Sequence, residues 1–358
     1  MRKSRDPIFA PERKKHPGII TTLMLVLLIA AVVVCFNYIN NSRVSLEKKS
    51  ITIASLPKQA ENFRILHISD LHGLHFGAGQ ERLSDALQDT YCDIVVFTGD
   101  ACDPEGNFDA FLALIDLFPE TPFYFIPGDE DPAPLIATPH EGDSPKAPFI
   151  QAAEERGAIY LDAPVLLSGG SQSLWLSPET VYSLDADSME KTLTARLEEL
   201  QKEANSPEKK AALEAVLYQQ DRLLRIREAR KQMLPSDSHI ALSHHPLTES
   251  AMGNLVEFLK TDNESYVSTI ALILSGHYVG GQWKLPLLGA LKVPATSEMG
   301  KGGWLPDNTY VSGLSYSLGI AQHISPGLGV SKANGLPPIR LFNTPTVTLI
   351  TLTTKLVY

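Results

Sequence analysis

The sequence contains little cysteine, and this shortage limits how the chain can be stabilised. Only three of its 358 residues are cysteine, and one of them, Cys35, lies within a long apolar run. The other two, Cys92 and Cys102, are separated by "DIVVFT", which has the composition of a strand. An extended strand of that length holds two Cα atoms farther apart than the ~7 Å that a disulfide can bridge. We therefore expect no disulfide framework and predict that Cys92 and Cys102 are small buried residues.

Positive charge is also in short supply. The chain has 31 Lys and Arg against 41 Asp and Glu, so its formal net charge is -10. Proteins that bind nucleic acid select basic surfaces, so we expect no nucleic-acid partner. With 44% hydrophobic and 20% charged residues, the composition is that of a globular protein with enough chain for one large domain.

The N-terminal region combines a basic tail with an apolar run. Residues 19–39 carry no charged side chain and have the length of about 20 residues that a bilayer core requires. The basic flank, residues 1–18, predicts a cytoplasmic N-terminus. A cleaved signal peptide is the alternative, although no small-x-small cleavage site follows the run. We predict a single-pass cell-membrane protein with a transmembrane helix over 19–39, a polar linker over 40–50 and an extracytoplasmic domain over 51–358.

Five apolar runs in this domain are each followed by an acidic residue or a histidine. They are rich in β-branched and aromatic residues, as buried strands are. Helical patterns such as "ERLSDALQDTY" lie between several of them, and this alternation predicts an α/β sheet. Ligands gather at the carboxyl ends of such strands. The runs are "RILHISD", "DIVVFTGD", "FYFIPGD", "HIALSH" and "IALILSGH", which end at Asp70, Asp100, Asp129, His244 and His277.

Residues 186–234 differ from the rest because they are charged, glycine-free and helical in pattern. Ser206 and Pro207 have the types preferred at a helix N-cap and first turn, so we predict a helical hairpin on or beside the sheet domain. We favour a packing insert, with a substrate lid or partner-binding arm as the alternative, and its partner is unknown. The predicted apolar stripes are Leu193, Leu197 and Leu200 in the first helix, and Leu213, Leu217 and Leu224 in the second.

After His277 the chain becomes glycine-rich and strand-like, from "YVGGQWKLPLLGALKVPA" through "IRLF" to "TVTLITLTT". We predict that these short strands form a second sheet. The fold class is therefore α/β, with two stacked mixed β-sheets flanked by helices, an N-terminal transmembrane helix and the inserted helical hairpin.

Aspartate and histidine together at strand ends suit a divalent transition metal such as Mn, Fe, Zn or Ni. Asp70 and His72 stand two residues apart in "DLH", so an extended strand end can aim both side chains the same way. This pair alone is a weak indication of a metal site, but it becomes a strong one because "GDACD", "SHHP" and "GHYVGGQ" follow it in the chain.

In this order the motifs resemble those of the calcineurin-like metallophosphoesterases, D-x-H, G-D-x-x-D, G-N-H-D/E, H and G-H-x-H. The resemblance runs from residue 51 to the C-terminus, interrupted by the helical insert. "ISDLHGLHFGAGQERL" and "SGHYVGGQWKLP" are similar to the membrane-associated branch, which hydrolyses UDP-diacylglucosamine-type pyrophosphates or related phosphoesters. The resemblance implies two sheets between helices and two metal ions that activate a water molecule. Carried over by position, the first ion takes Asp70 and His72, Asp100 bridges, and the second ion takes Asp129, His244 and His277.

Two motifs depart from the family pattern, at three positions. "GDED" stands where G-N-H-D/E is expected, so Asp129 replaces the Asn ligand and still offers an oxygen. Glu130 replaces the His that protonates the leaving group, and beside cations a carboxylate is a poor acid at neutral pH. Val279 replaces the second His of G-H-x-H and cannot coordinate a metal. Water or Glu130 itself would then complete the first ion's ligands.

Three functions are compatible with these residues. The first is a metal-dependent phosphoester or pyrophosphate hydrolase with one or two ions, acting outside the cytoplasm on a cell-envelope, lipid-linked or small-molecule phosphate. The second is a catalytically impaired pseudo-phosphoesterase that binds metal or ligand as a regulatory module. The third is a structural relic. Loss of a general acid typically slows an enzyme by about 10²–10⁴-fold without abolishing it, which favours the hydrolase.

The remaining histidines and acids receive structural roles. His67 lies inside an apolar run and is predicted to be a packed core residue. His245 is either at the pocket edge or part of the turn before Pro246. We expect His75 and His323 near the mouth of the pocket. Turn or cap roles are predicted for two further carboxylates, Asp103 and Asp131.

Overall fold

The computed structural model describes residues 17–136, 145–261, 270–294, 303–332 and 335–355, and it divides into two units, Met1–Ile39 and Asn40–Tyr358. Helix α1 (Pro17–Asn41) accounts for the described part of the first unit. Its stretch Ile20–Asn41 has 22 residues and a mean hydropathy of 2.6, which suits a membrane span or a signal sequence. Residues 1–16, with most of the predicted basic tail, lie outside the described residues.

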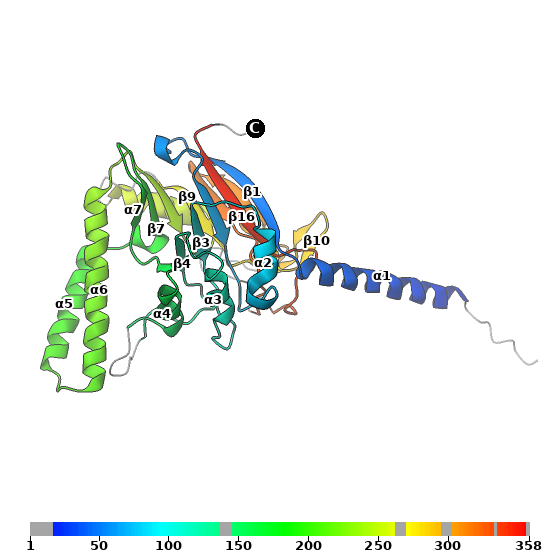
Figure 1. Cartoon of the computed structure of the whole chain (residues 1–358), viewed down its shortest axis with the longest axis horizontal. Helices are drawn as coiled ribbons and strands as arrows, with labels where there is room; N and C mark the ends of the chain where they lie inside the picture. Colours follow the sequence, from blue (N-terminus) through cyan, green and yellow to red (C-terminus); the bar gives the residue numbers. More distant parts are fainter. Residues whose placement is uncertain (1–16, 137–144, 262–269, 295–302, 333–334, 356–358) are drawn as a thin grey trace, which may run out of the picture. The chain divides into compact units, whose positions relative to one another are not determined.

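The second unit contains two six-stranded mixed sheets (Figure 1). In the first sheet, β2, β3, β4 and β5 run parallel, β16 lies antiparallel to β2, and β1 lies parallel to β16. Its order is β1 (Ser45–Thr52), β16 (Thr346–Thr353), β2 (Arg64–Ile68), β3 (Ile94–Thr98), β4 (Phe123–Ile126) and β5 (Ile159–Tyr160).

The second sheet has a parallel centre and two antiparallel edges. Strands β15, β9, β8 and β7 run parallel, whereas β14 and β6 pair antiparallel with their neighbours. Its order is β14 (Gly313–Ser317), β15 (Ile320–Ile324), β9 (Ile270–Ser275), β8 (Ser238–Leu242), β7 (Leu174–Pro178) and β6 (Val165–Ser168).

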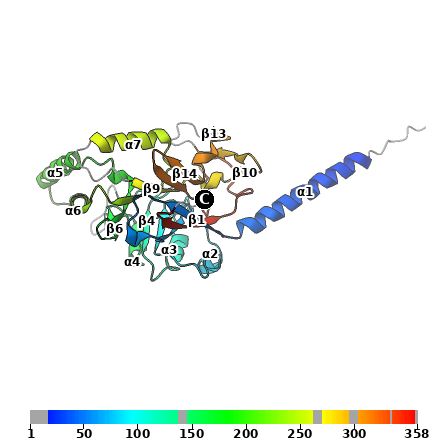
Figure 2. The same cartoon turned by 90° about the horizontal axis from the view of Figure 1, so that it is seen from above.

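The sheets pack face to face and carry helices on their outer faces, as the sequence predicts. Because side chains alternate along a strand, each strand contributes residues to the apolar layer between the sheets and to an apolar layer on the outer face of its sheet. Ile65 and Val96 of the first sheet meet Ile240 and Leu272 of the second in the inner layer. The outer layers pack against α2 (Glu81–Ala86), α3 (Asp109–Ile115) and α4 (Pro148–Glu155) on one side and α7 (Glu249–Thr261) on the other (Figure 2).

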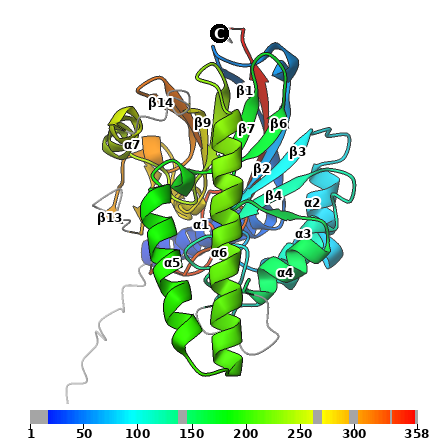
Figure 3. The same cartoon turned by 90° about the vertical axis from the view of Figure 1, so that its left-hand side faces the viewer.

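The insert forms the predicted helical hairpin of α5 (Ala186–Lys202) and α6 (Pro207–Gln232) (Figure 3). The Asp185 carboxylate accepts hydrogen bonds from two backbone amides of the first turn of α5. The Ser206 hydroxyl accepts one from the amide of Lys209, and Pro207 opens α6 where no amide hydrogen is needed.

The predicted apolar stripe of α6 is wrong at Leu217 and Leu224, although Leu213 is half-buried, whereas the predicted stripe of α5 is half-buried to buried along its length. Leu217 and Leu224 are 48% and 57% exposed. The face that packs instead carries Leu223 and Ile226, one position before and two after Leu224, and Ile226 contacts Ala163 and Val181. Leucines occur on two faces of α6, and only the position of the sheet decides which face is covered.

Two strand predictions also need correction. Strand β1 begins at Ser45, inside the range 40–50 predicted as a linker, because a polar edge strand such as "SLEKKSIT" resembles a linker in composition. The C-terminal run forms β16 in the first sheet rather than the second.

The segment between His277 and β14 forms two small ribbons outside the second sheet, and "IRLF" contributes only a bridge from Leu341 to Trp283. The ribbon strands are β10 (Lys284–Leu285), β11 (Gly289–Ala290), β12 (Lys292–Val293) and β13 (Gly303–Trp304). Short 3-10 turns are η1 (Lys58–Ala60), η2 (Ala78–Gln80), η3 (Glu179–Val181), η5 (Val279–Gly281) and η6 (Asn308–Tyr310).

Candidate metal centre

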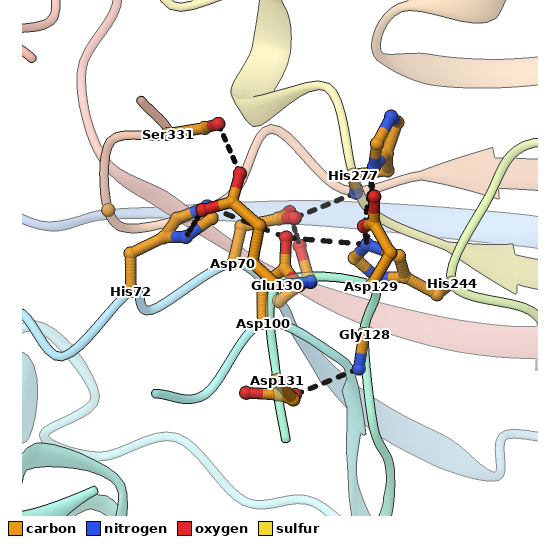
Figure 4. A network of polar contacts seen from close by, with 12 residues as sticks. Asp70, His72, Asp100, Gly128, Asp129, Glu130, Asp131, His244, His277 and Ser331 are labelled. Atoms are coloured by element: carbon orange, nitrogen blue, oxygen red, sulfur yellow. Dashed lines mark hydrogen bonds and ion pairs between the residues drawn. The ribbon is translucent and has the colours of Figure 1, made fainter. Parts of the chain in front are cut away.

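The carboxyl ends of five strands bring the predicted ligands together (Figure 4). Strands β2, β3 and β4 supply the acidic residues and His72, and β8 and β9 of the other sheet supply His244, His245 and His277. Three groups of side chains each place ligand atoms within 4.8 Å of one another, and shared members link the groups. The groups are Asp129, His244, His245 and His277; Asp70, Asp100 and His244; and His72, Asp100 and Glu130.

Four of these residues have positive φ angles, a backbone conformation that residues other than glycine rarely adopt. The φ angles are +53° at Asp70, +48° at His72, +59° at Asp100 and +75° at His277. Such strain concentrates at functional sites, where the surroundings must hold it in place. Here the amide of His72 donates to the carbonyl of Asp100 over 2.9 Å, which ties two strained turns together.

Asp129 faces the histidine side of the centre. Its Oδ1 lies 2.8 Å from His244 Nε2, 3.1 Å from His277 Nδ1 and 3.7 Å from His245 Nε2. His244 Nδ1 lies 2.7 Å from the carbonyl oxygen of Thr98, which can only accept a hydrogen bond. Nδ1 therefore carries the proton, and in the neutral ring Nε2 keeps a lone pair directed into the centre.

His72 and Glu130 form the opposite side. Glu130 Oε2 lies 3.4 Å from His72 Nδ1, and Asp100 Oδ2 lies 3.7 Å from His72 Nε2. Both ring nitrogens of His72 are buried, and neither has a well-formed hydrogen bond within the described part of the chain. Buried polar atoms normally find partners, so these two nitrogens point to a ligand. The other oxygen of Glu130 accepts a hydrogen bond from the Ser331 hydroxyl.

The centre gathers four carboxylates, those of Asp70, Asp100, Asp129 and Glu130. None of them forms an ion pair with Lys or Arg among the residues that the structure describes. Buried Arg340 donates instead to the carbonyl oxygens of Pro326, Gly329 and Asn343. Clustered carboxylates and imidazoles that lack a paired Lys or Arg in the described residues fit divalent metal ions.

The carboxylates differ in the direction of their pKa shifts. Burial raises the pKa of Asp70. For Asp129, burial raises the pKa, but the hydrogen bonds from His244, His245 and His277 outweigh it and lower the pKa below its usual value. At Glu130, burial is likewise outweighed by His72 and Ser331, so the pKa is lowered. Glu130 is therefore ionised at neutral pH and is a poor proton donor, as the sequence predicts.

Two of the buried histidines, His72 and His244, respond to these carboxylates. Burial alone would lower the pKa of His244, but Asp100 and Asp129 outweigh it and raise the pKa well above its usual value. His72 shows the same balance, with Glu130 and Asp100 raising its pKa against burial. Without a metal the centre therefore favours protons on His72 and His244, and a divalent ion would have to replace them.

The three adjacent carboxylates of the turn "PGDED" each have different contacts. Asp129 faces the histidines, Glu130 faces His72, and Asp131 accepts hydrogen bonds of 2.8 Å from the amides of Ala101, Cys102 and Gly128. Asp131 is thus the predicted turn carboxylate. Asp103 has a similar role, because its side chain accepts from the amides of Glu105 and Asn107.

Two histidine positions clarify the sequence predictions. His67 is a core residue, as predicted, with no exposed surface. The prediction that His323 lies near the pocket mouth is wrong, because His323 is fully buried and its Nδ1 lies 2.8 Å from His67 Nδ1. Strand β15 turns this side chain into the layer between the sheets, where burial lowers its pKa to about 3. His75 is exposed and lies outside the three ligand groups.

The structure also places the two cysteines, Val279, His245 and Ser331. Cys92 and Cys102 are buried and free, as predicted. Val279 is buried in η5, two residues beyond His277, and contributes no ligand atom. The sequence left the role of His245 open, although the doubled histidine of "SHHP" was a signal. Ser331 gave no signal, because it lies 201 residues from Glu130 in the chain.

Known proteins are similar to this chain in sequence and in fold. A sequence profile described as calcineurin-like phosphoesterase matches residues 63–280. Among solved structures, the phosphopantetheinyl hydrolase of Mycobacterium tuberculosis is similar at 13% identity and a TM-score of 0.36, covering 74% of this chain and 89% of that chain. TT1561 of Thermus thermophilus is similar at 10% identity and a TM-score of 0.35, covering 75% and 90%. No curated protein matches the chain.

Proposed function

Because the chain belongs to the calcineurin-like phosphoesterase family, we propose that it hydrolyses phosphoester or pyrophosphate bonds outside the cytoplasm, on a cell-envelope or lipid-linked phosphate. The observation that carries the proposal is the convergence of four carboxylates and four histidines at the strand ends, with no Lys or Arg paired to them in the described residues. The apolar helix α1 supports membrane attachment by a single span, with the N-terminus in the cytoplasm.

The proposed ligands of one or two divalent ions are Asp70, His72, Asp100, Asp129, His244 and His277. Such ions supply positive charge for the phosphoryl oxygens and make water more acidic. Asp100 lies between the two sides of the centre, with Oδ2 within 3.3 Å of His244 Nε2 and 3.7 Å of His72 Nε2. Thr98 and Ser331 orient His244 and Glu130 through hydrogen bonds. Since Glu130 is ionised, the leaving group takes its proton from water.

The finer assignment to the membrane-associated branch rests on motif similarity and on α1. Both favour a substrate held at the membrane surface, such as a lipid-linked pyrophosphate of the UDP-diacylglucosamine type. The candidate divalent ions are Mn, Fe, Zn and Ni, because carboxylate and imidazole groups bind all four.

The test uses the full chain in detergent with added Mn²⁺ and bis(p-nitrophenyl) phosphate as a generic phosphodiester. We expect turnover above the Mn²⁺ blank and a loss of at least about 10³-fold in Asp100→Asn, because a central metal ligand is removed. Asp109→Asn is the matched control, since Asp109 lies at the start of α3 and belongs to none of the ligand groups. An Asp100→Asn variant as active as Asp109→Asn would contradict the proposal.

One observation favours the pseudo-phosphoesterase as a second candidate, namely the ionised Glu130 at the general-acid position. Glu130→His distinguishes the two. A hydrolase that lacks only its acid should gain about 10²-fold, the lower end of what general acids contribute. If metal stabilises both proteins but neither hydrolyses substrate, the site is a binding module.

A further inference from the structure

A cavity of about 810 Å³ adjoins the metal centre on its histidine side. His244 and His245 form part of its wall, so the cavity and the centre share side chains. Residues at the carboxyl ends of β4, β7 and β8 line the cavity, and so do Tyr218, Gln219 and Arg222 of α6 in the helical insert. Its volume is in the range that holds a drug-sized ligand, about 300–1,000 Å³.

Most of the wall near the sheets is apolar. Leucines from five separate segments face the cavity, and they would offer no hydrogen bond to a small hydrated phosphate. A ligand that fills this part must therefore carry an apolar body. The leucines are Leu135, Leu161, Leu184, Leu242 and Leu247.

The wall formed by α6 is polar and positively charged. Asp162 is neutralised by Arg225, whose guanidinium nitrogens lie 2.7 and 2.9 Å from its two carboxylate oxygens. Arg222 donates through Nε to the carbonyl of Asp162 over 2.8 Å and forms no ion pair with a carboxylate among the described residues. Arg222 is therefore a cationic side chain of the wall without an ion pair in the described residues, although its charge also acts on Asp162 and Glu179 lines the same cavity.

Gln219 adds an unused acceptor to the same wall. Its Oε1 is buried and has no hydrogen-bond partner in the part of the chain that the structure describes. An unpaired buried polar atom is unfavourable unless a ligand or water satisfies it. Arg222 and Gln219 are three residues apart on α6 and so share one helix face.

We propose that this cavity binds the organic part of the substrate, and that the substrate is an organic phosphate with a bulky apolar body and a second anionic or hydrogen-bonding group. The inference rests on the proposed hydrolase function, because it assigns the scissile phosphate to the adjoining metal centre. The apolar body lies against the leucines, and the second polar group reaches Arg222 and Gln219. The helical insert is therefore part of the binding site as well as a packed helix pair.

Binding is tested with naphthalene-2,6-disulfonate, an uncleavable probe with an apolar body and an anion at each end. The full chain in detergent with Mn²⁺ is titrated by calorimetry, with empty micelles as the blank. We expect binding that weakens about tenfold in Arg222→Gln, as for loss of a hydrogen bond to a charged group. Arg227→Gln is the matched control, because Arg227 lies on the same helix, outside the cavity wall, and pairs with Asp187 and Glu190.

A second variant tests the apolar wall without touching the charge. Leu135→Trp fills space in the cavity, whereas Leu224→Trp adds the same side chain at an exposed position of α6 outside the wall. With Mn²⁺, wild type should prefer 1-naphthyl over phenyl phosphate by about tenfold in kcat/KM, and Leu135→Trp should bring this ratio close to one. Leu224→Trp should leave it unchanged.

The outcomes separate this inference from the proposed function. Probe binding that is sensitive to Arg222→Gln, without turnover of any phosphate, would support the cavity and contradict the hydrolase. Turnover with equal kcat/KM for both aryl phosphates, together with equal probe affinity in Arg222→Gln and Arg227→Gln, would overturn the cavity proposal and leave the hydrolase intact. No probe binding to the wild type would also overturn it.

Discussion

Gly128 shows at the scale of one residue why the metal centre tolerates little change. A Cβ atom added at this position would collide with the Asp100 carboxylate and with its backbone amide. The adjoining amide of Glu130 donates to Asp100 Oδ1 over 3.0 Å, and that of Gly128 donates to Asp131. The turn after β4 and the Asp100 carboxylate after β3 are therefore packed against each other with no spare space.

We predict that Gly128→Ala lowers Mn²⁺-dependent phosphodiesterase activity by at least about 10²-fold, because Asp100 must move to admit the methyl group. The overpacking should cost about 1–3 kcal/mol of unfolding free energy, which leaves the fold intact by circular dichroism. Gly253→Ala in α7 is the control, since an added Cβ there meets only Leu318 at an ordinary distance of 3.8 Å. Unchanged activity in Gly128→Ala would contradict the packing argument.

Helix α6 illustrates how an element of mixed sequence is fixed in place. Apart from its packing against Val181 and Ala163, it is held by polar contacts to Asp162, which follows β5. Arg225 pairs with both carboxylate oxygens, and the Tyr218 hydroxyl donates to one of them. Burial raises the pKa of Asp162, but these contacts outweigh it and lower the pKa below its usual value. One ionised carboxylate therefore contributes to holding the insert, together with Arg230, which donates to the carbonyls of Val181 and Leu184.

We predict that Asp162→Asn lowers the free energy of unfolding by about 1–3 kcal/mol at pH 7, the value of hydrogen bonds to a charged group. Because the folded-state pKa of Asp162 is lowered, its stabilisation is fully present above the unfolded pKa of about 4 and is lost as the pH falls below it. Urea unfolding of wild type and variant should thus differ at pH 7 and converge toward pH 2.

The control for this element is Asp187→Asn. Asp187 pairs with Arg227 on the same hairpin, but its side chain is 85% exposed, so the change should be below about 0.5 kcal/mol. A deficit of Asp162→Asn that is as large at pH 2–3 as at pH 7 would show that packing, and not charge, anchors α6.

In the molecule as a whole, the candidate ligands join the two sheets at one edge. Asp70, Asp100 and Asp129 follow strands of the first sheet, whereas His244 and His277 follow strands of the second. Direct contacts already link the two sides, for example Asp70 Oδ1 with the amide of His277 at 2.7 Å. A divalent ion at this edge would connect the sheets and relieve the repulsion between carboxylates.

We predict that Mn²⁺ raises the thermal unfolding temperature of the full chain in detergent and that a chelator reverses the rise. At a free ion concentration of 100 times Kd, the added stability is about 2.7 kcal/mol. Asp100→Asn should lose most of this response, whereas Asp109→Asn should keep it. A wild-type unfolding temperature that does not change with Mn²⁺ would contradict a metal centre, and the bound stoichiometry would show whether one or two ions bind.

Much of the fold and of the site could be predicted because the signals were local. Each apolar run and its terminal Asp or His are neighbours in the chain, so strands β2, β3, β4, β8 and β9 and the convergence of their ends followed from pattern. The errors have a different origin. The exposed Leu217 and Leu224, the burial of His323 and the contact of Ser331 with Glu130 all depend on which distant segment lies opposite.

The sequence by itself determined the apolar N-terminal helix, the buried strands, the helical hairpin and the types of ligand, because each is set by residues close together in the chain. Only the tertiary structure decided that Glu130 faces His72, that β16 joins the first sheet, and that Arg222 of the insert faces a cavity beside His244. These facts arise from contacts between segments far apart in sequence, where packing and charge choose among partners that the local pattern leaves equivalent.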